Sequence, residues 1–355
     1  MGGHMHRYRF FFILQLVCSL ALGARVELPW SPLPEKPPTP KDNPSTREKI
    51  SLGKQLFFDP RISLDGTISC NSCHNVMGNG TDNKPTSAGV DAKHGGRSAP
   101  TVWNSAFHSV QFWDGRAASL EDQAKGPMTN PVEMAMKDHA MVMDRISRIP
   151  GYVAQFKKVF NGENSTTIEN TAKAIAAYER TLITRNSPFD RYMRGNKKAI
   201  SAQAEKGMKT VIELGCITCH RGQNFNGTDL KMGEGFYQKF PLLPDEVYTP
   251  KYRFMDDKGR AETTKKEEDE HFWRVPTWRN VALTAPYFHN GSVATLEEAV
   301  RIMAKVQLGK EVTEEQVSDI VSFLNTLVGE FPEQTLPRLP ETPGKTFFPL
   351  NAGNI

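Results

Sequence analysis

Two stretches of this sequence share one pattern: Cys70-Asn71-Ser72-Cys73-His74 and Cys216-Ile217-Thr218-Cys219-His220. In each, two cysteines stand two residues apart and a histidine follows at once. The pattern C-x-x-C-H is the attachment signature of c-type haem. Two thiols on one tight turn can reach the vinyl groups of one porphyrin, and the next residue then lies under the ring. The sequence therefore predicts two covalently bound haem c groups, each with the histidine of its motif as an iron ligand.

Other uses of paired cysteines fit less well. A four-cysteine zinc site needs both pairs brought together and gives no role to the histidine after each pair. A redox C-x-x-C belongs near a βαβ pattern, and no such pattern is apparent. Disulfides are the usual use of cysteine in exported proteins, but the added histidines favour haem.

Composition limits the function classes. The chain has 355 residues, with 44 Lys+Arg, 40 Asp+Glu and a formal net charge of +4. Residues 1–24 hold two of the basic residues and no acidic ones, so the rest carries 42 against 40, a net +2. This balance does not favour nucleic-acid binding. The length fits about two domains, and evenly mixed charges with an aromatic content of 9% exclude a mainly disordered chain.

Residues 1–24 are predicted to be a signal peptide. Arg7 and Arg9 precede an apolar run, Phe10–Leu22, which ends in small residues. The run is shorter than the about 20 residues that a membrane span needs, although an uncleaved anchor is the alternative. It is the only long apolar run, which excludes a multi-span membrane protein. We expect a periplasmic mature chain.

The rest of the chain divides into four predicted parts. They are a proline-rich arm (25–45), a first haem domain (46–195), a second haem domain (196–330) and a C-terminal tail (331–355). Apolar spacing predicts helices over 46–58, 119–125, 137–147, 151–160, 168–183 and from Ser201 to Cys216. Thr295 and Thr313 begin capping-box patterns for two late helices. The predicted fold is mostly α, with two cytochrome c-like domains that carry one haem each.

Several further strings resemble the bacterial dihaem cytochrome c peroxidases, in order from about residue 47 to 330. They are Leu56–Arg61, Gln111–Arg116, Pro131–Met134, Arg279–Ala282, Pro286–His289 and Ile302-Met303 with Gln307–Gly309. The resemblance implies reduction of hydrogen peroxide to two waters with two electrons and two protons. It also implies a small cytochrome c or cupredoxin as electron donor, and a homodimer.

The resemblance further implies roles for single residues. The first haem would be the low-potential, peroxidatic site. The second would be the high-potential site that receives electrons, with Met303 as its distal ligand, and Met–His ligation raises a haem potential. Trp113 matches the family tryptophan between the haems, and Gln123 and Glu133 match peroxide-pocket residues. From the residues alone, Met303 and Trp113 could equally be core side chains and Glu133 a surface carboxylate.

In this scheme Glu133 moves a proton from the near oxygen of peroxide to the leaving oxygen, first as base and then as acid. Gln123 supplies a neutral hydrogen bond to the peroxide. Asp114 and Arg116 are expected to form a structural ion pair or a contact to a haem propionate.

Two positions depart from the family pattern. In much of the family, a histidine after the first motif closes the peroxidatic iron, but Val90 stands at that position. The candidate distal ligand is then His94, and the alternative is an iron that is open without reductive activation. The family also has a calcium ion at the domain interface, whose backbone ligands Thr284 and Pro286 match. Because Ser98 replaces the usual asparagine, weak calcium binding or none is expected.

Two other functions remain open. A relative of the dihaem maturase would oxidise tryptophans of a partner protein, but that branch has tyrosine where Met303 stands. A non-catalytic electron carrier would have both irons closed by protein ligands.

Overall fold

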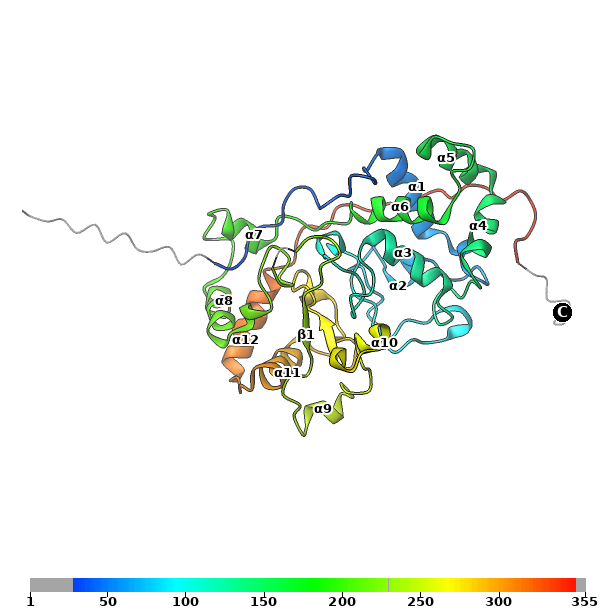
Figure 1. Cartoon of the computed structure of the whole chain (residues 1–355). Helices are drawn as coiled ribbons and strands as arrows, with labels where there is room; N and C mark the ends of the chain where they lie inside the picture. The colour runs from blue at the N-terminus through cyan, green and yellow to red at the C-terminus, as the bar shows by residue number, and fades with distance from the viewer. Residues whose placement is uncertain (1–27, 229, 349–355) are drawn as a thin grey trace, which may run out of the picture.

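The computed structural model describes residues 28–228 and 230–348. The signal peptide predicted over residues 1–24 lies outside them. The described chain is mostly helical, which confirms the predicted fold class (Figure 1). Its α-helices are α1 (Arg47–Phe58), α2 (Cys70–Cys73), α3 (Leu120–Thr129), α4 (His139–Ser147), α5 (Pro150–Phe160), α6 (Ile168–Glu179), α7 (Pro188–Met193), α8 (Ala202–Leu214), α9 (Tyr248–Lys251), α10 (Ala261–Thr264), α11 (Leu296–Leu308) and α12 (Glu314–Asn325). None of them is both long enough and apolar enough to cross a bilayer.

Two large hydrophobic cores divide the chain into two units. The first unit is built around the core residues between Leu52 and Leu182, and the second around those between Phe189 and Leu327. In the first unit α1 crosses α6, and a Cβ on Gly53 would lie 1.8 Å from the carbonyl oxygen of Ala174. In the second unit α8 crosses α12, and a Cβ on Gly207 would lie 1.9 Å from the carbonyl oxygen of Asp319. Only glycine allows either pair of backbones to come this close. A two-stranded antiparallel sheet, β1 (Tyr237–Lys239) and β2 (Phe272–Arg274), belongs to the second unit.

A buried polar contact joins the units at equivalent positions. Asn104 and Asn280 are 176 residues apart (280 − 104) and have left-handed backbone, with φ of 64° and 60°. Each begins a short 3-10 helix, η3 (Ser105–Phe107) or η6 (Val281–Leu283). Both side-chain amides donate to the hydroxyl of Thr184, at 2.8 and 2.9 Å. All three side chains are buried. Their hydrogen bonds therefore fix Thr184, in the segment between α6 and α7, at the contact between the two units.

The same spacing of 176 residues continues beyond these asparagines. Phe112 and Phe288 (288 − 112) both have left-handed backbone, with φ of 65° and 70°. Trp113 and His289 follow them directly and so occupy equivalent places in the two units. The sequence pattern had indicated only that a helix precedes each C-x-x-C-H motif.

The terminal segments cross between the units. Near the N-terminus Trp30 is buried in the second core, and its indole N–H donates to the carbonyl of His220 at 2.7 Å. Farther along, Asn43 donates to Glu121 at 2.6 Å, in the first unit. The C-terminal segment runs back over the first unit, where Phe331 packs edge-on against Trp103 (Figure 1).

Two local expectations need correction. The helix predicted over 168–183 ends at Glu179, because the chain turns at Arg180. At Thr295 only half of the expected capping box forms. Its hydroxyl accepts from the Glu298 N–H at 3.2 Å, but the Glu298 carboxylate accepts from the Tyr252 hydroxyl at 2.8 Å. The box at Thr313 is complete.

Candidate functional site

The first C-x-x-C-H motif is a single helical turn. Ser69 caps α2, and the N–H of His74 donates to the carbonyl of Cys70 at 2.9 Å. This turn places Cys70, Cys73 and His74 within one turn of each other. The Nδ1 atom of His74 lies 3.0 Å from the carbonyl oxygen of Pro100.

The second motif has the same arrangement. α8 ends at Gly215, whose φ of 90° turns the chain into the 3-10 helix η4 (Cys216–Thr218). The N–H of His220 donates to the carbonyl of Cys216 at 3.0 Å. Its Nδ1 lies 2.9 Å from the carbonyl oxygen of Phe225.

Both histidines are prepared to bind a metal. A carbonyl can only accept, so each Nδ1 carries the proton and each Nε2 keeps a free lone pair. Burial lowers the pKa of His74 and lowers that of His220 to about 4, which keeps both rings neutral, as metal ligation requires. The four motif cysteines form no disulfide. These residues fit c-type haem.

The zinc alternative is wrong for the described residues. The two cysteine pairs lie in separate units, on α2 and on η4. Among residues 28–228 and 230–348, no group of three or more His, Cys, Asp or Glu side chains could hold a metal ion.

A largely apolar cavity of about 260 Å³ lies beside the second motif and is called the second cavity after that motif. Its wall includes Cys216, Cys219, His220 and, from α11, Met303. The Trp278 ring stacks on the His220 imidazole at 4.3 Å and 19°, which holds the plane of that ring. The cavity therefore brings together the predicted proximal and distal ligands of the second haem.

Trp113 lies on the wall of this cavity, at the boundary of the two units. Its indole N–H donates to the carbonyl of Ser98 at 2.9 Å, and the Ser98 N–H donates to the carbonyl of His289 at 2.7 Å. The Trp113 carbonyl accepts from the N–H of Arg274 at 2.8 Å. Two hydrogen bonds of Trp113, and a third from Ser98 to His289, therefore tie Trp113 to residues of both units.

Glu133 lies on the loop that follows α3, close to the first motif. Its backbone carbonyl accepts from the Val90 N–H at 2.8 Å, and its Oε1 accepts from the Asn130 side chain at 2.5 Å. Burial raises the pKa of Glu133. Burial also raises the pKa of Cys73, and the charge of Glu133 adds to that increase. Gln123 is half-buried on α3.

The loop of residues 84–98 holds the two positions that depart from the family pattern. Val90 is buried, with 1% of its surface exposed. His94 is exposed and its Nδ1 lies 3.1 Å from the hydroxyl of Thr86. In this conformation the imidazole of His94 faces solvent.

Ser98, Thr284 and Pro286 all lie on the wall of the second cavity. The Ser98 hydroxyl donates to the carbonyl of Lys84 at 3.3 Å. The three supply one hydroxyl and two backbone carbonyls but no carboxylate, whereas calcium sites usually include carboxylates.

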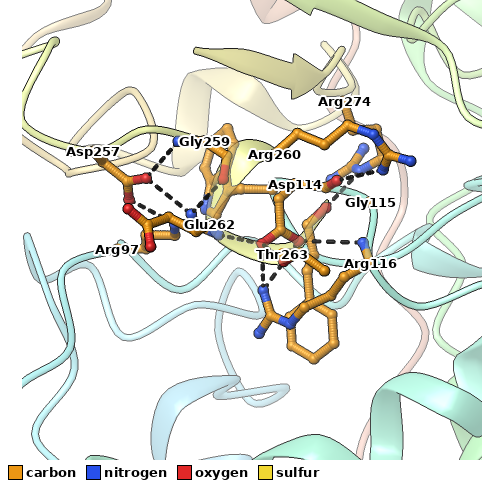
Figure 2. A network of polar contacts seen from close by, with 12 residues as sticks. Arg97, Asp114, Gly115, Arg116, Asp257, Gly259, Arg260, Glu262, Thr263 and Arg274 are labelled. Atoms are coloured by element: carbon orange, nitrogen blue, oxygen red, sulfur yellow. Dashed lines mark hydrogen bonds and ion pairs between the residues drawn. The ribbon is translucent and has the colours of Figure 1, made fainter. Parts of the chain in front are cut away.

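Arg97 ties the 84–98 loop to the second unit (Figure 2). It donates to Asp257 from Nε at 2.7 Å and from Nη2 at 2.9 Å, and to Asp114 from Nη1 at 2.6 Å. Asp114 also accepts from Arg116 at 2.9 Å. Burial alone would raise the pKa of Asp114, but Arg116 and Arg97 hold it below its ordinary value. Asp114 and Arg116 thus form the structural ion pair that was one of their two expected roles.

Sequence reasoning missed two residues on the cavity wall, Trp273 and Arg274, and it included His289 only as the last residue of the Pro286–His289 string. Trp273 and His289 are stacked at 4.1 Å, although they are 16 positions apart (289 − 273). The equivalence of His289 with Trp113 is a second sequence signal for His289, whereas Trp273 and Arg274 have none.

Comparison with known proteins gives consistent results. The family model described as "Di-haem cytochrome c peroxidase" matches residues 47–198. A relative named cytochrome c551 peroxidase, from Pseudomonas aeruginosa, is 43% identical over 93% of this chain and 92% of its own length. The methylamine utilization protein MauG of Methylorubrum extorquens is 34% identical over 86% of each chain. A crystal structure of a MauG-like protein associated with microbial copper homeostasis matches with a TM-score of 0.72 and 27% identity, over 84% of this chain and 95% of the other.

Proposed function

Since the chain belongs to the di-haem cytochrome c peroxidase family and is a peroxidase that acts on hydrogen peroxide, we propose that electrons enter at its second haem and peroxide is reduced at its first. The observation that supports this order most directly is the shared wall of His220 and Met303 in the second cavity. The two haems supply electron transfer and cleavage of the O–O bond. All other steps fall to side chains of this chain.

We propose covalent attachment at Cys70 and Cys73 for the first haem and at Cys216 and Cys219 for the second. His74 and His220 would bind iron through Nε2, because each Nδ1 is engaged by a backbone carbonyl. Trp113 lies on the wall of the second cavity and hydrogen-bonds to the 84–98 loop through Ser98. This placement supports its role as the aromatic group between the two haems.

The peroxide pocket would be formed by Gln123 and Glu133. A Glu133 carboxylate oxygen would accept a proton from the peroxide oxygen nearer the first haem iron and return it to the other oxygen, which leaves as water. Gln123 has a neutral amide on α3 that can hold the peroxide by a hydrogen bond.

Met303→His is expected to lower the potential of the second haem. A thioether ligand favours the reduced iron more than an imidazole does. The variant should keep both haems and show a changed spectrum for the second. The measurement is a spectroscopic redox titration of wild type and variant. An unchanged potential and spectrum would mean that Met303 packs in the core without binding iron.

The first iron is expected to be open or only partly closed in the oxidised protein. Val90 has no donor atom, and His94 faces solvent next to Gly95 and Gly96, which allow large backbone changes. His94→Gly should therefore give a high-spin first haem that reacts with peroxide without prior reduction. The check is the EPR and absorbance response of oxidised wild type and variant to added peroxide. If both proteins are fully six-coordinate, a residue other than His94 is the ligand.

The electron donor is proposed to be a small periplasmic cytochrome c or cupredoxin, and the enzyme a homodimer. Calcium is expected to bind weakly or not at all, because Ser98 offers a single hydroxyl where the family has an amide. Addition of a chelator should then leave turnover unchanged.

Two measurements separate the proposed function from its alternatives. Rapid peroxide turnover by reduced protein excludes the non-catalytic carrier. EPR of the oxidised and half-reduced protein reports the ligands of each iron, and a Met–His signature for the second haem separates this chain from the maturase branch. The identity to the cytochrome c551 peroxidase of Pseudomonas aeruginosa, 43%, is higher than the 34% to MauG of Methylorubrum extorquens, which supports the same choice.

A further inference from the structure

Two ring nitrogens in the wall of the second cavity have no hydrogen-bond partner. The indole nitrogen is always a donor, and the imidazole nitrogen is a donor in its Nε2–H tautomer. The indole Nε1 of Trp273 and the imidazole Nε2 of His289 are buried and make no hydrogen bond. The two residues are 5% and 3% exposed, so water does not reach them from outside. Buried polar groups are nearly always paired, and each one left unpaired costs about 1–3 kcal/mol. Both atoms therefore require a partner that binds in the cavity.

The two donors are held in a fixed arrangement. The rings of Trp273 and His289 are stacked at 4.1 Å and 17°. The guanidinium of Arg97 lies 5.0 Å from the centre of the Trp273 ring, and Arg97 is itself fixed by Asp257. Two nearly parallel rings that each carry a ring N–H are suited to two oxygens of one group. A carboxylate has that geometry.

The charge in this part of the cavity favours an anion. Arg274, next to Trp273 on β2, is buried on the cavity wall. Within the described residues its guanidinium donates to neutral acceptors, which are Phe112 O at 3.1 Å, His108 Nδ1 at 3.2 Å and Val275 O at 3.3 Å. Burial lowers the pKa of Arg274 to about 10, which still leaves it protonated at neutral pH. A buried cation on the wall of the cavity that also holds two unpaired ring nitrogens favours a negatively charged group there.

We propose that Trp273 and His289, supported by the charge of Arg274, bind a propionate carboxylate of the haem in the second cavity. The rest of the wall is largely apolar and suits the porphyrin face, whereas these residues suit its carboxylate edge. The proposal rests on the assignment of a haem to Cys216 and Cys219.

The residues that would hold the carboxylate are also linked to Trp113. The backbone N–H of Arg274 donates to the Trp113 carbonyl at 2.8 Å. The backbone carbonyl of His289 accepts from Ser98, whose own carbonyl accepts from the Trp113 indole at 2.9 Å. The residues that hold the carboxylate therefore also position Trp113. Trp273 and His289 are positioning residues that fix the haem relative to the next aromatic group on the electron path.

The test compares Trp273→Phe, His289→Phe and the double variant with wild type. Phenylalanine keeps a stacked ring and removes the donor. Resonance Raman spectra of half-reduced protein, excited at the ferrous Soret band, select the second haem. We expect its propionate bending band to move to lower frequency in each single variant and farther in the double variant. Trp103→Phe is the matched control, because Trp103 is a buried tryptophan of the first unit whose indole donates to Gly78 O. Its band should match wild type.

A redox titration at pH 8 gives the second readout. A carboxylate that loses its donors favours the ferric iron, so the equilibrium with a fixed mediator should shift toward ferric haem on the order of tenfold for each donor removed. A double variant with the haem attached and with the wild-type band and potential would overturn the proposal. If mass spectrometry finds no haem on Cys216 and Cys219 of wild type, the proposed function fails instead.

Discussion

Glu133→Gln is expected to lower peroxide turnover by about 10²–10⁴-fold, the range typical for loss of a general acid–base group. Glutamine keeps the size of the side chain and can still contact Asn130, but it cannot accept and return a proton. Both haems and their potentials should be unchanged, because Glu133 lies on the loop after α3 and belongs to neither C-x-x-C-H motif. The measurements are steady-state kcat and haem content. Wild-type kcat in this variant would show that the carboxylate takes no part in the reaction.

The pH profile provides a sharper test of the same residue. Burial raises the pKa of Glu133, while the amide of Asn130 opposes that increase. The base must be ionised to take the proton, so turnover should fall as the pH drops through this raised pKa, at a pH above the ordinary range for glutamate. The acid limb should be missing in Glu133→Gln. It should remain in the control Glu48→Gln, which alters an exposed carboxylate in the first turn of α1.

Asp190→Ala is expected to destabilise the protein by about 3–5 kcal/mol, the usual cost of leaving a buried charge unpaired. Asp190 on α7 pairs with Arg279, and the two side chains are 0% and 1% exposed. Arg279 Nη2 donates to Asp190 Oδ1 at 3.0 Å and Nη1 donates to Oδ2 at 3.3 Å. The pair fixes the start of the second unit against the segment behind its haem motif. The measurement is the free energy of unfolding by denaturant.

Two controls distinguish the effect of losing the buried Asp190–Arg279 ion pair from a general effect of mutation on stability. The pair Lys206–Glu315 is exposed and screened by solvent, so Glu315→Ala should change the free energy of unfolding little. Replacement of both buried partners, in Asp190→Leu with Arg279→Met, should recover part of the loss because no unpaired charge remains. A double variant that is less stable than Asp190→Ala would contradict this explanation.

The sequence predicted those features that depend on local pattern. The C-x-x-C-H motifs, the helical class and most helix positions follow from short-range spacing, and the structure places α1, α8 and α12 where that spacing put them. The links between the units have no such signal. Arg97 and Asp257 are 160 residues apart, and nothing around either residue indicates the other. The same holds for Trp30, whose proline-rich surroundings predict an extended arm but not burial against the second motif.

The residues around the candidate site show the same limit. Met303, Glu133 and Trp113 could be named only through family resemblance, because a methionine, a glutamate and a tryptophan each fit several environments. No sequence pattern identifies Trp273, and the patterns that include His289 do not indicate that the two rings stack. Their importance follows from two buried ring nitrogens without a hydrogen-bond partner on a cavity wall, which only a three-dimensional structure can show.

The repeat at 176 residues has a consequence for how one gene product came to hold two different metal centres. Counted back by the same interval, the helix start at Thr295 corresponds to Ser119, and Met303 corresponds to Pro127 (303 − 176). A proline carries no sulfur and cannot bind iron. If the chain arose by duplication of an ancestral one-haem module, then loss or gain of a single ligand on one copy was enough to make the twins unlike. Under the proposed ligation, one copy would bind its iron from both sides and transfer electrons. The other copy would keep one side of its iron open for peroxide, so that substitutions in one unit need not affect the other.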